Sequence, residues 1–532
     1  MRNRYWLAIF LIIFGFLFRI YCFGQIPESL YWDEVAIGLD AHSLIQTGED
    51  LSGKSWLQPL FYSYGDFKAP VYIWLVTILG FFLGVTETVI RLPSLILFTL
   101  SAWVLYRLVS QCSSKRSLLP IFVLFSYLIM PWSFHFSRIG MESFLSSGLL
   151  VFMVYLQFLA VKNSKWYLMV LSALFGIFSI YSYIGGRGIT LVLFSSGFLF
   201  FQWPNLKRNL LAFISGLLII LASIGLLIQS PDYSASQNYR LSNDNLIRTT
   251  EHIEKSVAAQ STDRDSLLSR LAHHRYYYWF QDYAHNYLIH FSPEFLFFNG
   301  DSNLRHHSGF GGQLLMLQSL LLILGFLRAV FYKKRISWLM AVWLLTAPIV
   351  SSLVNEVPHA SRAIYMIIPL SWFTGLGMEA FYNRLNRIRI GKLIFAGLVT
   401  ALLINFFFYL HDYFKHYPER SEIAWLVPYK KAALYFQEKK PENRVFITEE
   451  WYQPGLYFAF YGQAPAVLLQ DSQGGYLKEW GNFNFQLPKA CPEKDWCVVS
   501  RDWRMNDSTT IDAVSGTDRL VIKTKKAVDL PK

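Results

Sequence analysis

The sequence has few charged residues and none of the common nucleotide- or zinc-binding motifs. Asp, Glu, Lys and Arg make up 16% of its 532 residues, well below the roughly 25% of soluble proteins, which excludes an ordinary soluble chain. It contains no P-loop, no GxGxxG opening a βαβ unit and no HExxH helix, which argues against direct use of a cytoplasmic nucleotide. No small-residue cleavage site follows the apolar run 5–23, which indicates a retained first span.

Cysteine is also scarce. Two of the four cysteines, Cys491 and Cys497, lie close together in the sequence. They either stay free or form a disulfide, the second only if this region is exported to an oxidising compartment.

Apolar residues are abundant: 53% of the chain is hydrophobic and 17% is aromatic. Several runs approach the roughly 20 apolar residues that cross a bilayer, so the composition predicts a polytopic membrane protein. The net charge of +12 does not indicate nucleic-acid binding, because much of it comes from six short segments that contain no acid. These segments contain Arg2 and Arg4; Arg107, Lys115 and Arg116; Lys162 and Lys165; Lys207 and Arg208; Arg328, Lys333, Lys334 and Arg335; and Arg384, Arg387, Arg389 and Lys392.

The positive-inside rule places all six basic segments in the cytoplasm. The predicted spans between them number eleven: 5–23, 90–109, 117–133, 143–161, 166–182, 188–203, 209–229, 311–331, 337–354, 361–381 and 392–411. The N-terminus is then cytoplasmic, and the large loops 24–89 and 230–310 face outward. The run 69–84 does not fit this alternation and is interpreted as a helix on the outer leaflet, with a short span as the alternative.

The C-terminal part reads as soluble sequence. Lys430–Lys440 and Pro454–Tyr461 predict helices, and Arg444–Thr448, Cys497–Ser500 and Leu520–Thr524 predict strands. We therefore expect two domains: an all-α transmembrane domain of residues 1–411 and a small extracytoplasmic α/β domain of residues 412–532.

The strongest candidates for chemistry are Asp33 and Glu34, which follow Trp32 in the first outer loop. Two adjacent carboxylates beside very apolar sequence suit a general base at the membrane surface. The alternative is an acidic helix start, because acids are common in the first turn of a helix. Glu142 is a third carboxylate, at the outer end of a later span.

Four basic residues are also predicted on the outer side, against the positive-inside bias: Lys68, Arg138, Arg187 and Arg362. Such cations suit an anionic lipid headgroup, where negative charge develops as a phosphate leaves. The alternatives are a snorkelling lysine and ion pairs at the membrane edge. His359 precedes Arg362 and is taken as a further pocket residue. Histidines are also frequent in the loop 230–310, without regular ligand spacing; no metal ligand is assigned, although a divalent metal is possible.

The order of these elements resembles the GT-C glycosyltransferases, in particular the bacterial aminoarabinose transferase and protein O-mannosyltransferase group (glycosyltransferase family 39-like). The resemblance rests on Asp33-Glu34 followed by a helix ending in Thr47-Gly48-Glu49-Asp50, on Lys68 to Pro70, on Arg91-Leu92-Pro93-Ser94, on Ser137-Arg138 with Glu142, and on Val357 to Arg362. It implies that Asp33 is the catalytic acid, that Glu142 lies near the acceptor and that Lys68 lies near the donor phosphate. One residue, Ala69, separates Lys68 from Pro70, where some relatives have Lys-Pro directly.

The resemblance further implies an enzyme that moves a sugar from a polyprenyl-phosphate donor to a lipid, glycan or protein acceptor on the outer face, with inversion at the anomeric carbon. The alternatives are a flippase or transporter of lipid-linked sugars and an oligosaccharide polymerase or ligase. A transporter usually places its polar groups near the bilayer midplane, whereas these acids and cations are predicted at one face.

Overall fold

The computed structural model describes residues 2–64, 66–202, 206–242, 246, 250–263, 266–332, 335–471, 477–502, 508–514 and 519–525. Lys333 and Lys334 of the predicted cytoplasmic segments lie outside these residues. The chain divides into two compact units: residues 1–21 with 93–415, and residues 22–92 with 416–532. We call them the bundle unit and the sheet unit. The predicted domains, 1–411 and 412–532, instead assigned residues 22–92 to the membrane part.

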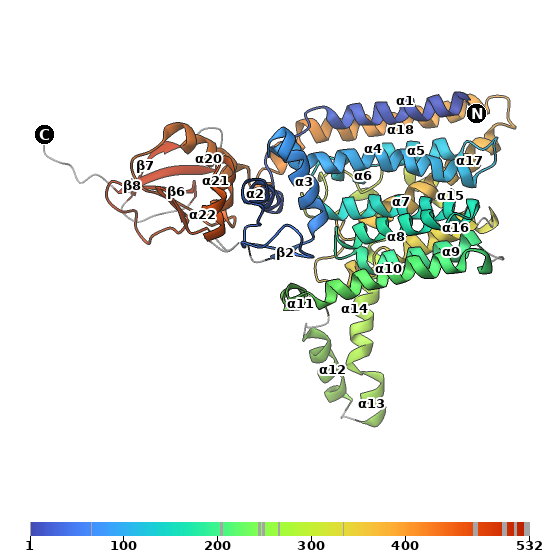
Figure 1. Cartoon of the computed structure of the whole chain (residues 1–532). Coiled ribbons are helices and arrows are strands. Elements are labelled where there is room, and N and C mark those ends of the chain that lie inside the picture. The colour runs from blue at the N-terminus through green and yellow to red at the C-terminus, as the bar shows by residue number, and fades with distance from the viewer. Residues whose placement is uncertain are drawn as a thin grey trace, which may run out of the picture. The chain divides into compact units, whose positions relative to one another are not determined.

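The bundle unit consists mainly of long helices that lie side by side (Figure 1). Each of the eleven predicted spans contains a helix, which confirms the expected multi-span helical fold. These helices are α1 (Arg2–Ile20), α4 (Glu87–Cys112), α5 (Leu119–Ile129), α7 (Glu142–Asn163), α8 (Trp166–Ile180), α9 (Gly186–Gln202), α10 (Leu210–Gln229), α15 (Gln318–Tyr332), α16 (Arg335–Thr346), α17 (Ile367–Leu385) and α18 (Gly391–Lys415). Among the described residues, seven helices are long and apolar enough to cross a membrane.

Several predicted spans are shorter than expected, among them 117–133, 311–331 and 337–354. The span 117–133 ends as α5 at Ile129, because Pro131 cannot donate a backbone hydrogen bond and begins the short helix α6 (Pro131–Phe136) instead. The span 337–354 ends as α16 at Thr346, and a separate 3₁₀ turn, η3 (Ser351–Leu353), follows.

Helix α17 lies at the centre of the bundle unit. In its most apolar window 89% of the residues are buried, against 17% for α10. Glycines permit its closest crossing: a Cβ on Gly377 would lie 1.8 Å from the carbonyl oxygen of Leu321, and a Cβ on Gly325 of α15 would lie 1.8 Å from that of Phe373. Small residues at such crossings are typical of membrane helices, which gain stability from close backbone packing.

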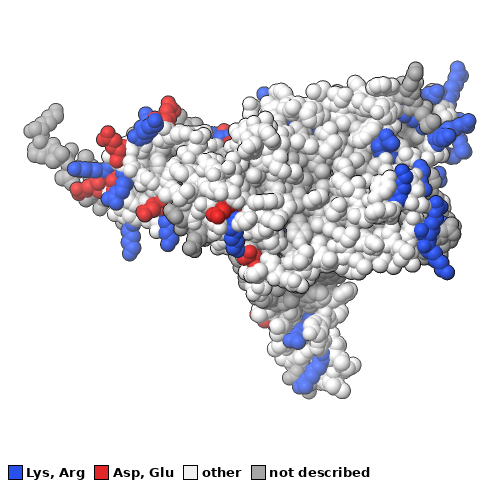
Figure 2. Space-filling view, in the orientation of Figure 1, with Lys and Arg blue, Asp and Glu red and all other residues white. Residues whose placement is uncertain are grey.

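The basic segments gather at the end of the bundle that carries the N-terminus (Figure 2). Hydrogen bonds join several of them directly. Arg4 Nη1 donates to the carbonyl of Ser117 at 2.8 Å, and Lys162 Nζ donates to Gln111 Oε1 at 2.6 Å. The charge pattern that predicted one cytoplasmic side therefore corresponds to one physical end of the bundle.

An arm of short helices interrupts the bundle between α10 and α15. It contains α11 (Pro231–Ser242), α12 (Glu251–Thr262), α13 (Leu267–Ala272) and α14 (Arg275–Ile289), followed by the π-helical turn η2 (Glu294–Phe298). In Figure 1, α12, α13 and α14 point away from the bundle, across the direction of its long helices.

The sheet unit contains residues 22–92, which include the predicted outer loop 24–89, and the C-terminal region. The loop forms α2 (Trp32–Thr47), the hairpin β1 (Phe61–Ser63) and β2 (Asp66–Lys68), and α3 (Pro70–Leu83), which packs on α2. With 14 residues, α3 is about 21 Å long, less than the roughly 30 Å of a bilayer core.

The C-terminal region forms a six-stranded mixed sheet in the order β4-β5-β3-β6-β8-β7. Among the described strands, only β3 pairs in parallel, through Val445↔Phe483 with β5 and Val445↔Trp496 with β6. The strands are β3 (Val445–Ile447), β4 (Glu479–Trp480), β5 (Phe483–Asn484), β6 (Trp496–Ser500), β7 (Ser508–Ala513) and β8 (Leu520–Lys525), and the helices are α19 (Tyr417–Arg420), α20 (Val427–Lys439), α21 (Pro454–Tyr461) and α22 (Ala466–Asp471). The predicted α/β character of this region is confirmed, and Cys491 and Cys497 form a disulfide.

Candidate functional site

The first turn of α2 brings Asp33 and Lys68 together. Asp33 Oδ1 accepts a hydrogen bond from Lys68 Nζ, and the two side chains are 35% and 3% exposed. Lys68 reaches this position from the end of β2, which pairs antiparallel with β1 through Phe61↔Lys68. The Lys68 ammonium also lies 5.3 Å from the ring centre of Trp32. The predicted acid, cation and aromatic residue therefore form one cluster, from which the Asp33 carboxylate is accessible.

Glu34, the neighbour of Asp33, has a different environment. Its carboxylate pairs with Arg91, at 3.1 Å to Nε and 3.2 Å to Nη2, and both side chains are buried. Glu34 Oε2 also accepts the backbone N–H of Tyr31 at 3.0 Å, as in a capping box. The carboxylate is thus held by a bidentate guanidinium and a helix cap, which suits a positioning role for Glu34.

Arg91 belongs to the motif Arg91-Leu92-Pro93-Ser94, but no role was predicted for it. Its guanidinium also donates to the carbonyls of Pro27 and Ser29, at 2.8 and 2.6 Å, and lies 5.6 Å from the ring of Trp425. Arg91 thereby joins the segment before α2, α2 itself and the C-terminal part of the sheet unit. The sequence feature that could have identified Arg91 is its position as an arginine in the first turns of an apolar helix.

A second acidic pair, Asp40 and Asp50, lies within the sheet unit and was not foreseen. Both side chains are fully buried. Asp50 accepts hydrogen bonds from Lys54 N at 2.8 Å and from Gln58 Nε2 at 2.7 Å, whereas Asp40 accepts a long hydrogen bond of 3.4 Å from Leu51 N. Burial, together with the negative charge of Asp50, raises the pKa of Asp40 from 3.8 to about 8.

We expect Asp40 to make stability dependent on pH. Because its pKa is raised in the folded state, the folded protein holds a proton between about pH 4 and pH 8 that the unfolded chain has released. Stability should therefore fall as the pH rises through this window. Asp40→Asn should flatten the decline, measured as the thermal unfolding midpoint in detergent at a series of pH values. An equally steep decline in this variant would contradict the assignment, and Asp282→Asn serves as the control at an exposed ion pair.

Three predicted site residues of the bundle unit lie on neighbouring segments: Glu142, Arg187 and Arg362. Glu142 begins α7, and Ser143 beside it shares a hydrogen bond of 2.8 Å with Ser361, beside Arg362. Arg187 lies in the first turn of α9 next to Gly186, where an added Cβ would lie 2.6 Å from Ser146 Oγ of α7. The structure thus brings together the ends of α7 and α9 and the segment before α17, and these three side chains are partly exposed.

Arg138 differs from the expectation of a ligand-facing cation. Its side chain is fully buried, and its guanidinium donates to the carbonyls of Arg19 and Tyr21, the latter at 2.8 Å. It also lies 5.1 Å from the ring of Phe414. Arg138 therefore ties the end of α1 to the segment after α6, a contact that stabilises the bundle.

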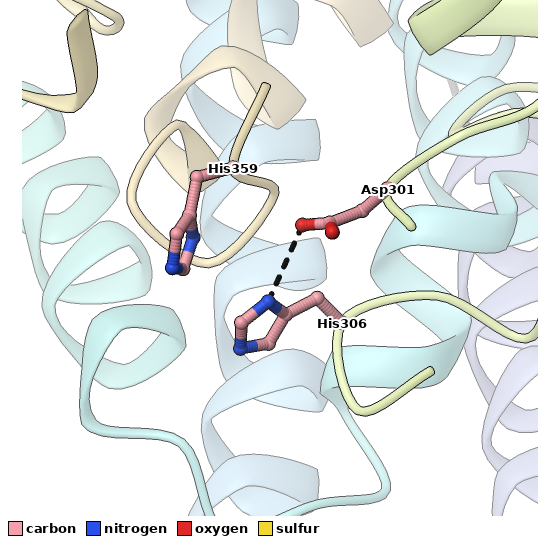
Figure 3. Close-up of side chains that lie close together, drawn as sticks. All are labelled: Asp301, His306 and His359. Carbon is pink, nitrogen blue, oxygen red and sulfur yellow. Dashed lines mark ion pairs between the residues drawn. The ribbon is translucent and has the colours of Figure 1, made fainter. Parts of the chain in front are cut away.

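His359 belongs to a buried group of three residues that was not predicted from the sequence. Its ring centre lies 4.5 Å from that of His306, and His306 Nδ1 lies 3.3 Å from Asp301 Oδ2 (Figure 3). The ligand atoms of the three residues all lie within 4.8 Å of one another. Asp301 Oδ2 also accepts the backbone N–H of Ala360 at 2.7 Å, which ties the loop before α15 to the loop before α17.

The protonation states of Asp301 and His359 suit a cation. Burial alone raises the pKa of Asp301, but the hydrogen bond from His306 and the Ala360 N–H outweigh it and lower the value to about 2. Burial lowers the pKa of His359 well below its usual value, and His306 and Arg362 lower it further. A charged carboxylate and a neutral imidazole are the forms that bind transition metals. The regular spacing usual for zinc ligands is absent, which explains why sequence reasoning did not find the group.

The two units together define a class of fold. A helical bundle with a structured loop after its first helix and a small C-terminal mixed sheet is the GT-C fold of membrane glycosyltransferases. ArnT from Cupriavidus metallidurans bound to undecaprenyl phosphate matches with a TM-score of 0.55, at 12% identity and over 97% of both chains. The apo state of the same protein matches with a TM-score of 0.53, at 11% identity and over 98% of both chains.

No protein-family model and no curated protein matches the sequence. At 11–12% identity, the likeness to ArnT establishes the fold. The expected GT-C resemblance is confirmed at that level, and the chain is a multi-pass membrane protein.

Proposed function

We propose that this protein transfers a sugar from a polyprenyl-phosphate donor to an acceptor on the outer face of the membrane. The observation that carries the proposal is the Asp33–Lys68 cluster: a partly exposed carboxylate beside a buried ammonium, in the first outer loop of a GT-C fold. The structure of ArnT with undecaprenyl phosphate supports a lipid phosphate as the ligand class. The Cys491–Cys497 disulfide supports an extracytoplasmic C-terminal region, because disulfides persist in oxidising compartments.

The proposed reaction is a single displacement with inversion. Asp33 accepts the proton of an acceptor hydroxyl or amine as that atom forms a bond to the anomeric carbon of the sugar. The bond between this carbon and the phosphate oxygen breaks, and polyprenyl phosphate leaves with its negative charge. The Lys68 ammonium stabilises the charge that develops on the phosphate. Trp32, beside Lys68, limits access of competing water.

The other predicted site residues are proposed to have different roles. Arg187 and Arg362, which are partly exposed, are proposed as further contacts for a phosphate, and Glu142 as a contact for the acceptor. Glu34 is proposed to hold α2 in place through Arg91, so that Asp33 keeps its position. Arg138 is proposed to stabilise the bundle, because its guanidinium is occupied by backbone carbonyls.

The function is tested with purified protein and a panel of radiolabelled polyprenyl-phosphate sugars. We expect one donor to be consumed with release of polyprenyl phosphate. Lys68→Met should lower the rate strongly, and Lys68→Arg, which keeps the charge, should lower it less. A protein that moves labelled donors across liposomes and leaves them intact would instead be a transporter.

We propose that Asp301, His306 and His359 hold a divalent metal ion, with zinc as the best fit to two imidazoles and one carboxylate. A bound ion would supply positive charge for an anionic ligand group. The three residues themselves join two loops of the bundle unit, through the Asp301 bond to Ala360.

The metal proposal predicts a stoichiometric ion in the purified protein. We expect about one equivalent of zinc per chain after dialysis, by mass spectrometry of metal content. His306→Ala and Asp301→Asn should lose the metal, and His285→Ala, an exposed histidine of α14, should keep it. Metal-free wild-type protein after purification in zinc-containing buffer would contradict the proposal.

A further inference from the structure

The arm formed by α12, α13 and α14 exposes a large apolar surface. At its tip, Leu267, Leu268 and Leu271 are 78%, 77% and 70% exposed. Aromatic side chains continue this surface along α14, where Tyr276 is 63% and Phe280 62% exposed. No side chain of α14, a helix that the structure describes in full, is buried. An exposed surface of this kind marks an interaction site.

The arm is held together by internal contacts. Lys255 of α12 pairs with Asp282 of α14 at 3.2 Å, and Gln260 donates to the carbonyl of His273 at 2.9 Å. The exposed leucines therefore belong to a formed helical hairpin.

Hydrogen bonds join the base of the arm to the end of α16 and to η3. Tyr287 OH donates to the carbonyl of Leu345 at 2.7 Å, and His290 Nε2 lies 2.8 Å from Ser351 Oγ of η3. The apolar window Arg335–Leu353 begins at the basic end of the bundle and reaches this base, and its 19 residues comprise α16, a turn and η3. The 12 residues of α16 extend about 18 Å, and the turns after them continue the segment away from the basic end. The base thus lies on the side of the bundle away from the basic end, toward the opposite membrane interface.

The direction and charge of the arm fit that interface. Figure 1 shows α12–α14 running across the direction of the long helices, and therefore along the membrane plane. Between Ser266 and Gln281 the sequence contains Arg270 and Arg275, two histidines and no acidic residue. Aromatic side chains at headgroup depth, leucines below them and arginines among them are typical of interfacial helices.

From these observations we propose that the arm lies in the headgroup region of the leaflet opposite to the basic end, and that it binds anionic lipid there. The leucines of α13 enter the upper acyl region, and Arg270 and Arg275 contact lipid phosphates. The exposed apolar face of α10, where Leu226 is 68% and Ile228 54% exposed, continues this lipid-contacting surface into the bundle unit. This inference does not depend on the proposed reaction.

The test uses the full chain in nanodiscs that contain one copy each. Cys22 and Cys112, the cysteines outside the Cys491–Cys497 disulfide, are replaced by Ala, and Leu268→Cys is labelled with an environment-sensitive fluorophore. We expect a blue-shifted emission that is quenched by lipids spin-labelled near the headgroup more than by lipids spin-labelled at the chain end. The same label at Lys489→Cys, an exposed position of the sheet unit, should be quenched by neither.

Two results would overturn the proposal. A water-like emission at position 268 would place the tip in solvent, and a blue shift without quenching by any spin-labelled lipid would mean that protein covers it. The binding of anionic lipid is tested separately. Arg270→Glu with Arg275→Glu should reduce quenching in discs with anionic lipid. Unchanged quenching in those discs would show that the arm does not select anionic headgroups.

Discussion

Asp33→Asn is expected to abolish sugar transfer and to leave the protein folded in the membrane. The substitution keeps the size of the side chain and its place in the first turn of α2, but it removes the group that accepts a proton. Loss of a general base lowers rates by about 10²–10⁴-fold. The measurement is the rate of polyprenyl-phosphate release from the donor by purified variant and wild-type protein.

The Asp33 prediction needs controls for folding and for charge. Because Asp33 is the partner of Lys68, the variant is compared with Lys68→Met, which breaks the same pair and keeps the carboxylate. Asp282→Asn, at an ion pair on the arm, should retain full activity. Near-wild-type turnover by Asp33→Asn would remove Asp33 from the proposed mechanism.

Arg91→Ala is expected to destabilise the protein strongly. The substitution leaves the Glu34 carboxylate buried without its guanidinium partner, and also removes the donors to Pro27 and Ser29. Breaking a buried ion pair on one side costs about 3–5 kcal/mol. The measurement is the shift of the denaturation midpoint in detergent, together with the rate of cleavage by trypsin.

A double variant separates the ion pair from general packing. Arg91→Met with Glu34→Leu removes both charges and should be less destabilising than Arg91→Ala, since no charge is left unpaired. Lys255→Ala, which breaks an exposed pair, should change stability by less than about 1 kcal/mol. Equal stability of Arg91→Ala and Lys255→Ala would show that the Glu34–Arg91 pair does not hold the sheet unit together.

The helices and the candidate acid were largely predictable. Apolar runs separated by basic segments correspond to one helix each, and those segments lie at one end of the bundle. Breaks within runs were harder to foresee, because they depend on single residues such as Pro131, which ends α5. Asp33 was identifiable because acids are rare beside apolar sequence, and Lys68 because a lone cation precedes α3.

The partners of the charged residues were not predictable. Glu34 and Arg91 were both visible, but nothing local indicated that one neutralises the other. Arg138 and Arg362 looked alike in sequence, yet one is fully buried against backbone carbonyls and the other is partly exposed. No local sequence signal marked Asp301, which the structure places beside His306 and His359.

The sequence by itself determined the order of the apolar helices, the basic end of the bundle and the α/β character of the C-terminal region. These properties follow from local composition, because lipid requires long apolar helices and translocation disfavours basic loops. Only the tertiary structure decided which charges pair. Asp33 and Lys68 are 35 residues apart, and Glu34 and Arg91 are 57 residues apart. Contacts over such separations depend on how separate elements pack, which local sequence does not encode.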